Sequence, residues 1–215
     1  MNAAPNRDRQ YAAAIDAELA AAYPAATCEL GFRDAYQLAV ATILSAQCTD
    51  VRVNQVTPRF FAHFPNARAL ARAEQGEIEK LIRSTGFYRN KARSLLGMAQ
   101  AVVERYAGEI PGDMDALLTL PGFGRKTANV VLGTAFGIAA GVVVDTHVTR
   151  LSRRLGLTRQ ADPEKIERDL IELFPPSSWV ALSHRLVLHG RRVCRARRPA
   201  CAECALVGLC PKVGL

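Results

Sequence analysis

The sequence predicts an all-α protein, and three observations support that class. Apolar residues recur three and four positions apart in segment after segment, as on one buried face of a helix. Short polar residues that cap helices stand at several segment starts, such as Asp34 and the Asp162-Pro163 pair. No convincing pair of strands is found, and apolar residues make up 49% of the 215 positions, enough for a packed core in one or two domains.

Each expected helix follows from this spacing. The cleanest covers about 90–106, where one apolar stripe runs from Ala92 to Tyr106. Asp34 is expected to cap a helix whose apolar positions fall between Tyr36 and Leu44. The remaining helices are expected at about 11–22, 51–63 and 78–82, on both sides of 120–124, after Asp145, from Pro163 and at 179–189.

The stretch Leu120–Ala128, with the sequence LPGFGRKTA, lies between two of these amphipathic runs. Pro121-Gly122 marks a turn, and Gly124 is expected to supply backbone freedom that other residues lack. The hairpin amides and the N-terminus of the next helix would then offer N–H donors to a phosphate. Lys126 falls in the first turn of that helix, where the positive end of the helix dipole should lower the pKa of its ammonium.

The same residues allow other interpretations of this stretch. A nucleotide-binding P-loop requires four residues between its first glycine and Gly-Lys-Ser/Thr, and the spacing here differs. A structural turn between two core helices stays open. So does a lysine that binds a phosphate without taking part in chemistry.

The charge of the chain favours a polyanionic partner. Lys and Arg number 28 against 20 acidic residues, a formal net charge of +8. The first ten residues show no secretory signal. The longest uncharged run, 127–144, contains glycines and polar residues, so we expect a buried helix, a connector and an extended segment there rather than a membrane span.

Four of the six cysteines stand near the C-terminus, spaced Cys194-x6-Cys201-x2-Cys204-x5-Cys210. Without a secretory signal, ligation of a metal or cluster is favoured over disulfides. Zinc ribbons usually carry two Cys-x2-Cys pairs and only one is present, whereas iron–sulfur clusters accept uneven spacings. Spacing alone therefore favours an iron–sulfur cluster and leaves zinc open.

Together these motifs resemble the helix-hairpin-helix DNA glycosylases, and within them the endonuclease III branch. The shared features are the LPGFGRKTA hairpin, the aspartate Asp145 one helix and a loop later, and the cysteine spacing that follows Leu-His-Gly-Arg. The resemblance covers about 11–211. It implies a [4Fe-4S] cluster on the four C-terminal cysteines and two helical lobes, a six-helix barrel at 28–137 and a discontinuous domain built from 1–27 and 138–215.

The resemblance also implies a bifunctional enzyme of base excision repair, which removes oxidised pyrimidines and cleaves the abasic site 3′ by β-elimination (AP lyase). Lys126 is the expected nucleophile, attacking C1′ and leaving a Schiff base. Asp145 is expected to accept a proton and stabilise the cationic sugar, although its sequence context alone makes it a helix N-cap. A monofunctional adenine or mismatch glycosylase is an alternative, as are a non-catalytic DNA-binding module and a zinc-stabilised one.

The expected partner is damaged double-stranded DNA. The protein is expected to be a monomer and to act in a bacterial-type cytoplasm, at the nucleoid. A base that leaves the duplex opens a gap, which the family fills from two loops. Gln47 matches the family's glutamine, and Phe87 stands where leucine is usual, with a ring that can still wedge or stack. Further DNA contacts are expected from the hairpin, from the segment after Asp145 and from arginines around the first cysteine: Gly122, Gly124, Arg125, His147, Arg191, Arg195, Arg197 and Arg198.

Overall fold

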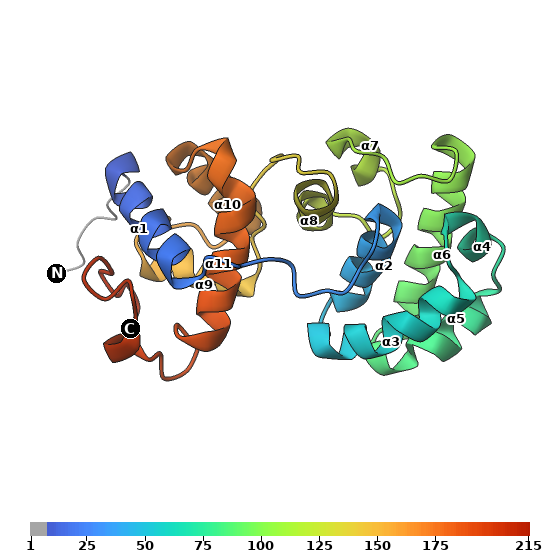
Figure 1. The fold of residues 1–215 in the computed structure, drawn as a ribbon, viewed down its shortest axis with the longest axis horizontal. Helices are drawn as coiled ribbons and strands as arrows, with labels where there is room; N and C mark the ends of the chain where they lie inside the picture. The colour runs from blue at the N-terminus through green and yellow to red at the C-terminus, as the bar shows by residue number, and fades with distance from the viewer. Residues whose placement is uncertain (1–7) are drawn as a thin grey trace. The chain divides into compact units, whose positions relative to one another are not determined.

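The computed structural model describes residues 8–215, and these residues form helices and connecting segments with no strand (Figure 1). The predicted all-α class is confirmed. The α-helices are α1 Arg9–Ala22, α2 Ala35–Ser45, α3 Asp50–His63, α4 Ala67–Ala71, α5 Gln75–Ile82, α6 Tyr88–Arg105, α7 Met114–Leu118, α8 Arg125–Ala135, α9 Thr146–Arg154, α10 Pro163–Leu173 and α11 Trp179–Arg192. The 3-10 helices are η1 Arg83–Thr85, η2 Pro176–Ser178 and η3 Cys201–Glu203.

Backbone contacts group the chain into two compact units. One unit is Cys28–Ile138, which holds α2 to α8. The other joins the described part of Met1–Thr27 to Ala139–Leu215, so it contains α1, α9, α10 and α11 with the C-terminal cysteines. We call them the hairpin unit and the cysteine unit and describe each by itself.

Capping residues account for where several helices begin. Asp34 accepts the N–H of Gln37 at 2.8 Å at the start of α2, and Asp162 accepts that of Lys165 at 3.0 Å at the start of α10, as predicted. Helix α4 has no counterpart among the expected helices. Five residues are too few to display a helical repeat, although Asn66 caps it through the N–H of Ala69.

Helix α6 is central to the hairpin unit, where it packs against α2, α4 and α5. Its buried face differs from the predicted stripe. Val103 and Tyr106 are only half-buried, whereas Met98 and the charged Lys91 are buried. The difference arises because several helices surround α6 from different directions, so burial does not follow a single face.

The cysteine unit has its own apolar core, formed by side chains of its four α-helices and of the segments beside them. Cys194, Cys204 and Cys210 pack against that core. The hydroxyl of Tyr11 lies 2.9 Å from the carbonyl oxygens of both Leu155 and Leu209, which joins α1 to the end of α9 and to the cysteine segment.

The uncharged run 127–144 follows its prediction. It forms most of α8 and then a connecting segment without regular secondary structure, in which Val142 and Val144 are buried. Within the described residues, no helix has both the length and the apolar character that a membrane crossing requires.

Candidate functional site

The hairpin between α7 and α8 turns at Gly122, which has φ +84°. A Cβ at this position would lie 2.9 Å from the Cβ of Ser94 and 3.2 Å from Cδ1 of Ile43. Glycine is therefore required at position 122 by both backbone conformation and space. Phe123 follows as a buried anchor whose N–H donates to the carbonyl of Leu120 at 3.1 Å.

Gly124 has a different role from the one predicted. It has φ −110° and ψ 175°, an extended conformation that any residue adopts, so the expectation of special backbone freedom at Gly124 is wrong. The position that requires this freedom is Gly122, with its positive φ. Gly124 is the N-cap of α8, and apart from Gly124 and its two chain neighbours no heavy atom of the described residues lies within 4 Å of where its Cβ would be. The missing side chain leaves the approach to the helix N-terminus open.

Lys126 lies in the first turn of α8, and its side chain is exposed. The N-cap of this helix, Gly124, makes no side-chain cap hydrogen bond, because glycine has no side chain to accept one. Together, the N–H donors, the absent cap and the neighbouring ammonium form a site that suits a phosphate or another anion. This is the arrangement expected from the sequence.

Asp145 is the N-cap of α9, in the cysteine unit. Its Oδ1 accepts the N–H groups of His147 and Val148, both at 2.8 Å. The interpretation of Asp145 as a cap is thus confirmed. Because both bonds use Oδ1, they fix the carboxylate and leave Oδ2 outside the cap, and the residue is only half-buried.

Two arginines one turn apart on α9 donate hydrogen bonds to the segment around Cys194, the first of the four C-terminal cysteines. Arg150 donates to the carbonyl of Gly190 at 2.8 Å and to that of Cys194 at 3.0 Å. Arg154 donates to the carbonyl of Arg195 at 2.8 Å and to Sγ of Cys194 at 3.3 Å. Sequence reasoning missed both residues, and an arginine spacing of four on a helix is too common to identify them.

His147 is half-buried and lies against this same contact. Its Nδ1 is 3.1 Å from a terminal nitrogen of Arg150. A Cβ at Gly190 would come within 2.9 Å of His147, so α9 and α11 approach each other closely there. The structure therefore gives His147 a packing role, and its predicted contact with DNA stays a prediction.

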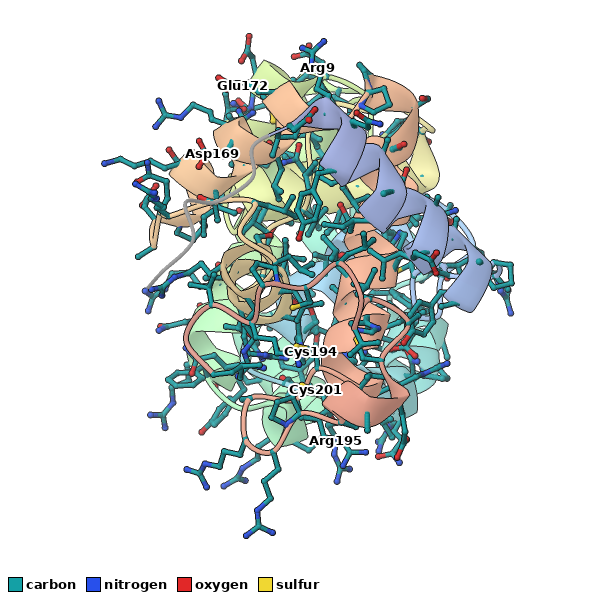
Figure 2. The ribbon with its side chains drawn as sticks, turned by 90° about the vertical axis from the view of Figure 1, so that its left-hand side faces the viewer. Arg9, Asp169, Glu172, Cys194, Arg195 and Cys201 are labelled. Carbon is teal, nitrogen blue, oxygen red and sulfur yellow. The ribbon has the colours of Figure 1, made fainter. Side chains whose placement is uncertain are left out.

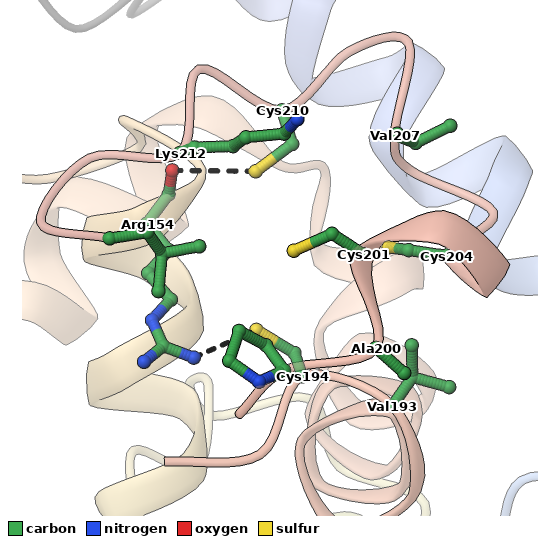
Figure 3. Close-up of a pocket in the computed structure, with 11 residues that line it drawn as sticks. Arg154, Val193, Cys194, Ala200, Cys201, Cys204, Val207, Cys210 and Lys212 are labelled. Atoms are coloured by element: carbon green, nitrogen blue, oxygen red, sulfur yellow. Dashed lines mark hydrogen bonds between the residues drawn. The ribbon is translucent and has the colours of Figure 1, made fainter. Parts of the chain in front are cut away.

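The four C-terminal cysteines line one pocket, which is partly open to solvent (Figure 3). Burial raises the pKa of the Cys204 and Cys210 thiols. His189, which sequence reasoning left unassigned, is buried with its Nε2 3.3 Å from Sγ of Cys204 and its Nδ1 3.0 Å from the hydroxyl of Tyr23. Chain folding thus brings together all four cysteines that the spacing singled out.

Arginines surround the first cysteine as predicted. Arg195 lies with Cys194 and Cys201 at one end of the cysteine unit, and Arg9 and Glu172 lie at the other end (Figure 2). Four of the predicted DNA-contacting arginines are exposed, Arg191, Arg195, Arg197 and Arg198, whereas Arg125 at the start of α8 is half-buried. Arg198 has φ +55°, an uncommon value for a residue with a side chain.

Gln47 and Phe87, the two residues expected to enter the gap in DNA, share an unusual backbone. Gln47 has φ +51° and Phe87 has φ +47°, both in the left-handed region. Gln47 is exposed, and the ring of Phe87 is 63% exposed. Strained backbone that carries an exposed aromatic ring is costly in a structural loop, and such strain concentrates at functional sites.

Comparison with known proteins gives a consistent result. The HhH-GPD superfamily base excision DNA repair protein family matches residues 40–176. The chain is similar to endonuclease III of Synechocystis sp., with 59% identity over 189 residues that cover 88% of this chain and 86% of that protein. It is also similar to endonuclease III of Bacillus subtilis, with 44% identity over 189 residues, 87% of this chain and 86% of that protein.

Solved structures agree. A structure of a non-covalent endonuclease III–DNA complex has a TM-score of 0.89 and 43% identity, and the alignment covers 94% of each chain. A trapped endonuclease III–DNA covalent intermediate has a TM-score of 0.89 and 42% identity, over 94% of this chain and 95% of that one. The predicted fold class is confirmed by these matches.

Proposed function

Since this chain belongs to the HhH-GPD superfamily of base excision DNA repair proteins, and within it to endonuclease III, we propose that Lys126 is the nucleophile of its glycosylase and lyase reactions. The enzyme is a bifunctional glycosylase/AP lyase of base excision repair, and its partner is damaged DNA. One observation carries the assignment of Lys126: it is an exposed amine in the first turn of a helix whose N-terminus is left open by Gly124.

The hairpin explains how this amine would be positioned. A phosphate of the DNA backbone accepts N–H groups at the start of α8, which fixes the strand next to the first helical turn. Lys126 is then held beside the sugar of the damaged nucleotide, which lowers the entropic cost of bringing the amine and C1′ together.

The chemistry requires the neutral amine. Nζ attacks C1′, the bond from C1′ to the base nitrogen breaks, and the base leaves with the electron pair and takes up a proton. Ring opening gives a Schiff base between Nζ and C1′. The iminium acidifies C2′, and loss of a C2′ proton drives out the 3′ phosphate. A single amine thus accounts for base removal and for strand cleavage.

Asp145 is the proposed partner in the first step. Its carboxylate is held by two backbone N–H groups, so it keeps one orientation, and Oδ2 is outside the cap. In this proposal the carboxylate accepts the proton released by the attacking amine and stabilises positive charge that develops on the sugar. The preferred lesions in this proposal are oxidised pyrimidines such as thymine glycol, and the protein acts at the nucleoid.

The [4Fe-4S] cluster is proposed on Cys194, Cys201, Cys204 and Cys210. Their shared pocket supports it. In residues 8–215, no three His, Cys, Asp or Glu side chains lie close enough together to hold one metal ion. A zinc ion bound about 2.3 Å from each of four tetrahedrally arranged sulfurs requires those sulfurs to lie within about 4 Å of one another. The spacing of the four cysteines therefore supports a larger group, such as the cluster, over a single zinc ion. When bound, the cluster cross-links the C-terminal segment and supplies a centre capable of electron transfer.

Borohydride trapping tests the assignment of Lys126. With thymine glycol in duplex DNA, the intact enzyme should form a covalent complex, and Lys126→Ala should lose it while keeping DNA affinity within about threefold, because one charge of many is removed. Lys165→Ala is the matched control, since Lys165 is also exposed in the first turn of a helix, α10. Trapping that persists in Lys126→Ala would refute the assignment.

Iron and sulfide analysis tests the cluster. Anaerobically purified protein should contain both iron and acid-labile sulfide. Stoichiometric zinc without sulfide would instead identify a zinc-stabilised protein.

A further inference from the structure

Lys91 is a buried cation in the hairpin unit that the proposed chemistry does not use. It stands near the start of α6, and only 5% of its surface is exposed. Its Nζ donates to the carbonyl oxygen of Leu44 at 2.8 Å and to that of Thr85 at 2.7 Å. Burial lowers the pKa of this ammonium, as expected for a cation withdrawn from water.

The two carbonyls belong to different segments of the chain. Leu44 is in the last turn of α2, where carbonyl groups have no partner within the helix, and Gln47 follows three residues later. Thr85 ends η1, and Phe87 follows two residues later. One ammonium therefore joins the bases of the loops that present Gln47 and Phe87.

The hairpin before α8 contacts the same two helices, α2 and α6. Ser94 of α6 and Ile43 of α2 are the residues that a Cβ at Gly122 would strike. Helix α2 also packs against α8. The Gln47 loop, the Phe87 loop and the phosphate-binding hairpin are thus attached to one pair of helices, and the Lys91 ammonium joins the ends of that pair next to both loops.

A merely space-filling role does not explain a charge at this position. Burying an ammonium is unfavourable unless it is hydrogen-bonded, and methionine would fill similar volume without that cost. What the ammonium adds is directional bonding to two carbonyls at once. Both loops leave that point with a left-handed residue, at Gln47 and Phe87, and such backbone persists only where its surroundings determine it.

We propose that Lys91 is a positioning residue, which fixes the spacing of the Gln47 and Phe87 loops so that both side chains enter the damaged duplex in register. This rests on the proposed function, in which these side chains fill the gap left by the extruded base. Lys91 touches neither the sugar nor the lesion, and it acts through the two loops alone.

A double-mutant cycle tests this role. The variants are Lys91→Met, Gln47→Ala with Phe87→Ala, and the three changes combined, each assayed for single-turnover excision of thymine glycol from duplex DNA. We expect Lys91→Met to slow excision by about tenfold or more in the intact enzyme, because loops displaced by a fraction of an ångström no longer fit together. In the loop-truncated background the same change should slow excision by less than about twofold.

A second readout isolates the loops from the chemistry. Cleavage of an abasic site in single-stranded DNA needs the amine but no filling of a gap in a duplex. Lys91→Met should leave that rate within about threefold of the intact enzyme, since the lyase chemistry is elsewhere. Arg93→Met is the matched control, because it removes one positive charge from an exposed position of the same helix.

The outcomes are distinct. Equal loss of excision with Lys91→Met in both backgrounds, or equal loss with the single-stranded abasic site, would overturn the proposal by showing a general structural defect. No loss in the intact enzyme would overturn it as well. If Lys91→Met does not fold, Lys91→Gln is carried through the same cycle with the same criteria. Failure of the intact enzyme to excise or trap would instead refute the proposed function.

Discussion

Helices α8 and α9 begin in opposite ways, and the difference separates two tasks. The start of α8 has a glycine N-cap with open space around it and no side-chain cap from the described residues. The start of α9 is closed by the Asp145 carboxylate, with two N–H bonds of 2.8 Å. A helix start without a side-chain cap can bind an external anion through its N–H groups. In a capped helix start, N–H groups already donate to the carboxylate of the capping residue. Each start carries one of the proposed catalytic groups.

Asp145→Asn, at the start of α9, should have the largest effect on activity. Asparagine still caps a helix, so the free energy of unfolding should change by less than about 0.5 kcal/mol. The charge is lost, and single-turnover excision should fall by more than about 100-fold. Asp162→Asn, the same change at the N-cap of α10, is the control and should keep full activity. Excision close to normal in Asp145→Asn would leave Asp145 as a cap alone.

Gly124→Asp would convert the start of α8 into one like that of α9. The new carboxylate can cap the helix, which should raise the free energy of unfolding by a few tenths of a kcal/mol, about the difference between aspartate and glycine caps. Because it competes with the DNA phosphate, affinity for duplex DNA should fall by about tenfold or more. Gly76→Asp adds the same charge at an open, exposed position of the hairpin unit and is the control. Unchanged affinity in Gly124→Asp would mean that no phosphate binds there.

Arg154→Met tests how α9 supports the segment around the first cysteine. Losing the bonds to Sγ of Cys194 and to the carbonyl of Arg195 should cost about 1–3 kcal/mol in unfolding free energy, because both acceptors lose a charged donor that is itself buried. The bound cluster should then lose iron several times faster in the presence of a chelator, measured by its visible absorbance. Arg153→Met, on the exposed side of the same helix, should change neither quantity.

Arg197→Ala should have the smallest effect. It removes one exposed charge, so the dependence of DNA affinity on salt concentration should weaken by about one unit of log–log slope, uniformly across sequences. Arg168→Ala on α10 is the matched control. A slope that is equal in both variants would remove the arginines around Cys194 from the DNA contact.

Capping residues and apolar spacing were sufficient to predict most of the fold. Asp34, Asp145 and Asp162 each signal a helix start through local chemistry, which a sequence displays directly. The hairpin was located by its motif, but the glycine that takes positive φ is Gly122, and the motif does not say which of its two glycines does so.

Residues that act across the chain could not be predicted in the same way. Lys91 has the sequence context of a solvated helix residue, yet it is buried because carbonyls 47 and 6 positions away surround its ammonium. Arg150 and Arg154 reach a segment about forty positions later. Such roles depend on tertiary contacts, and no local pattern encodes them.

Mapping the covalent bond tests the central claim most directly. The borohydride-reduced complex with thymine glycol DNA can be digested with nuclease and protease and the modified peptide sequenced by mass spectrometry. The reduced sugar should be attached to Nζ of Lys126. A sugar attached to any other residue would contradict that assignment, as would excision by the intact enzyme without any covalent complex.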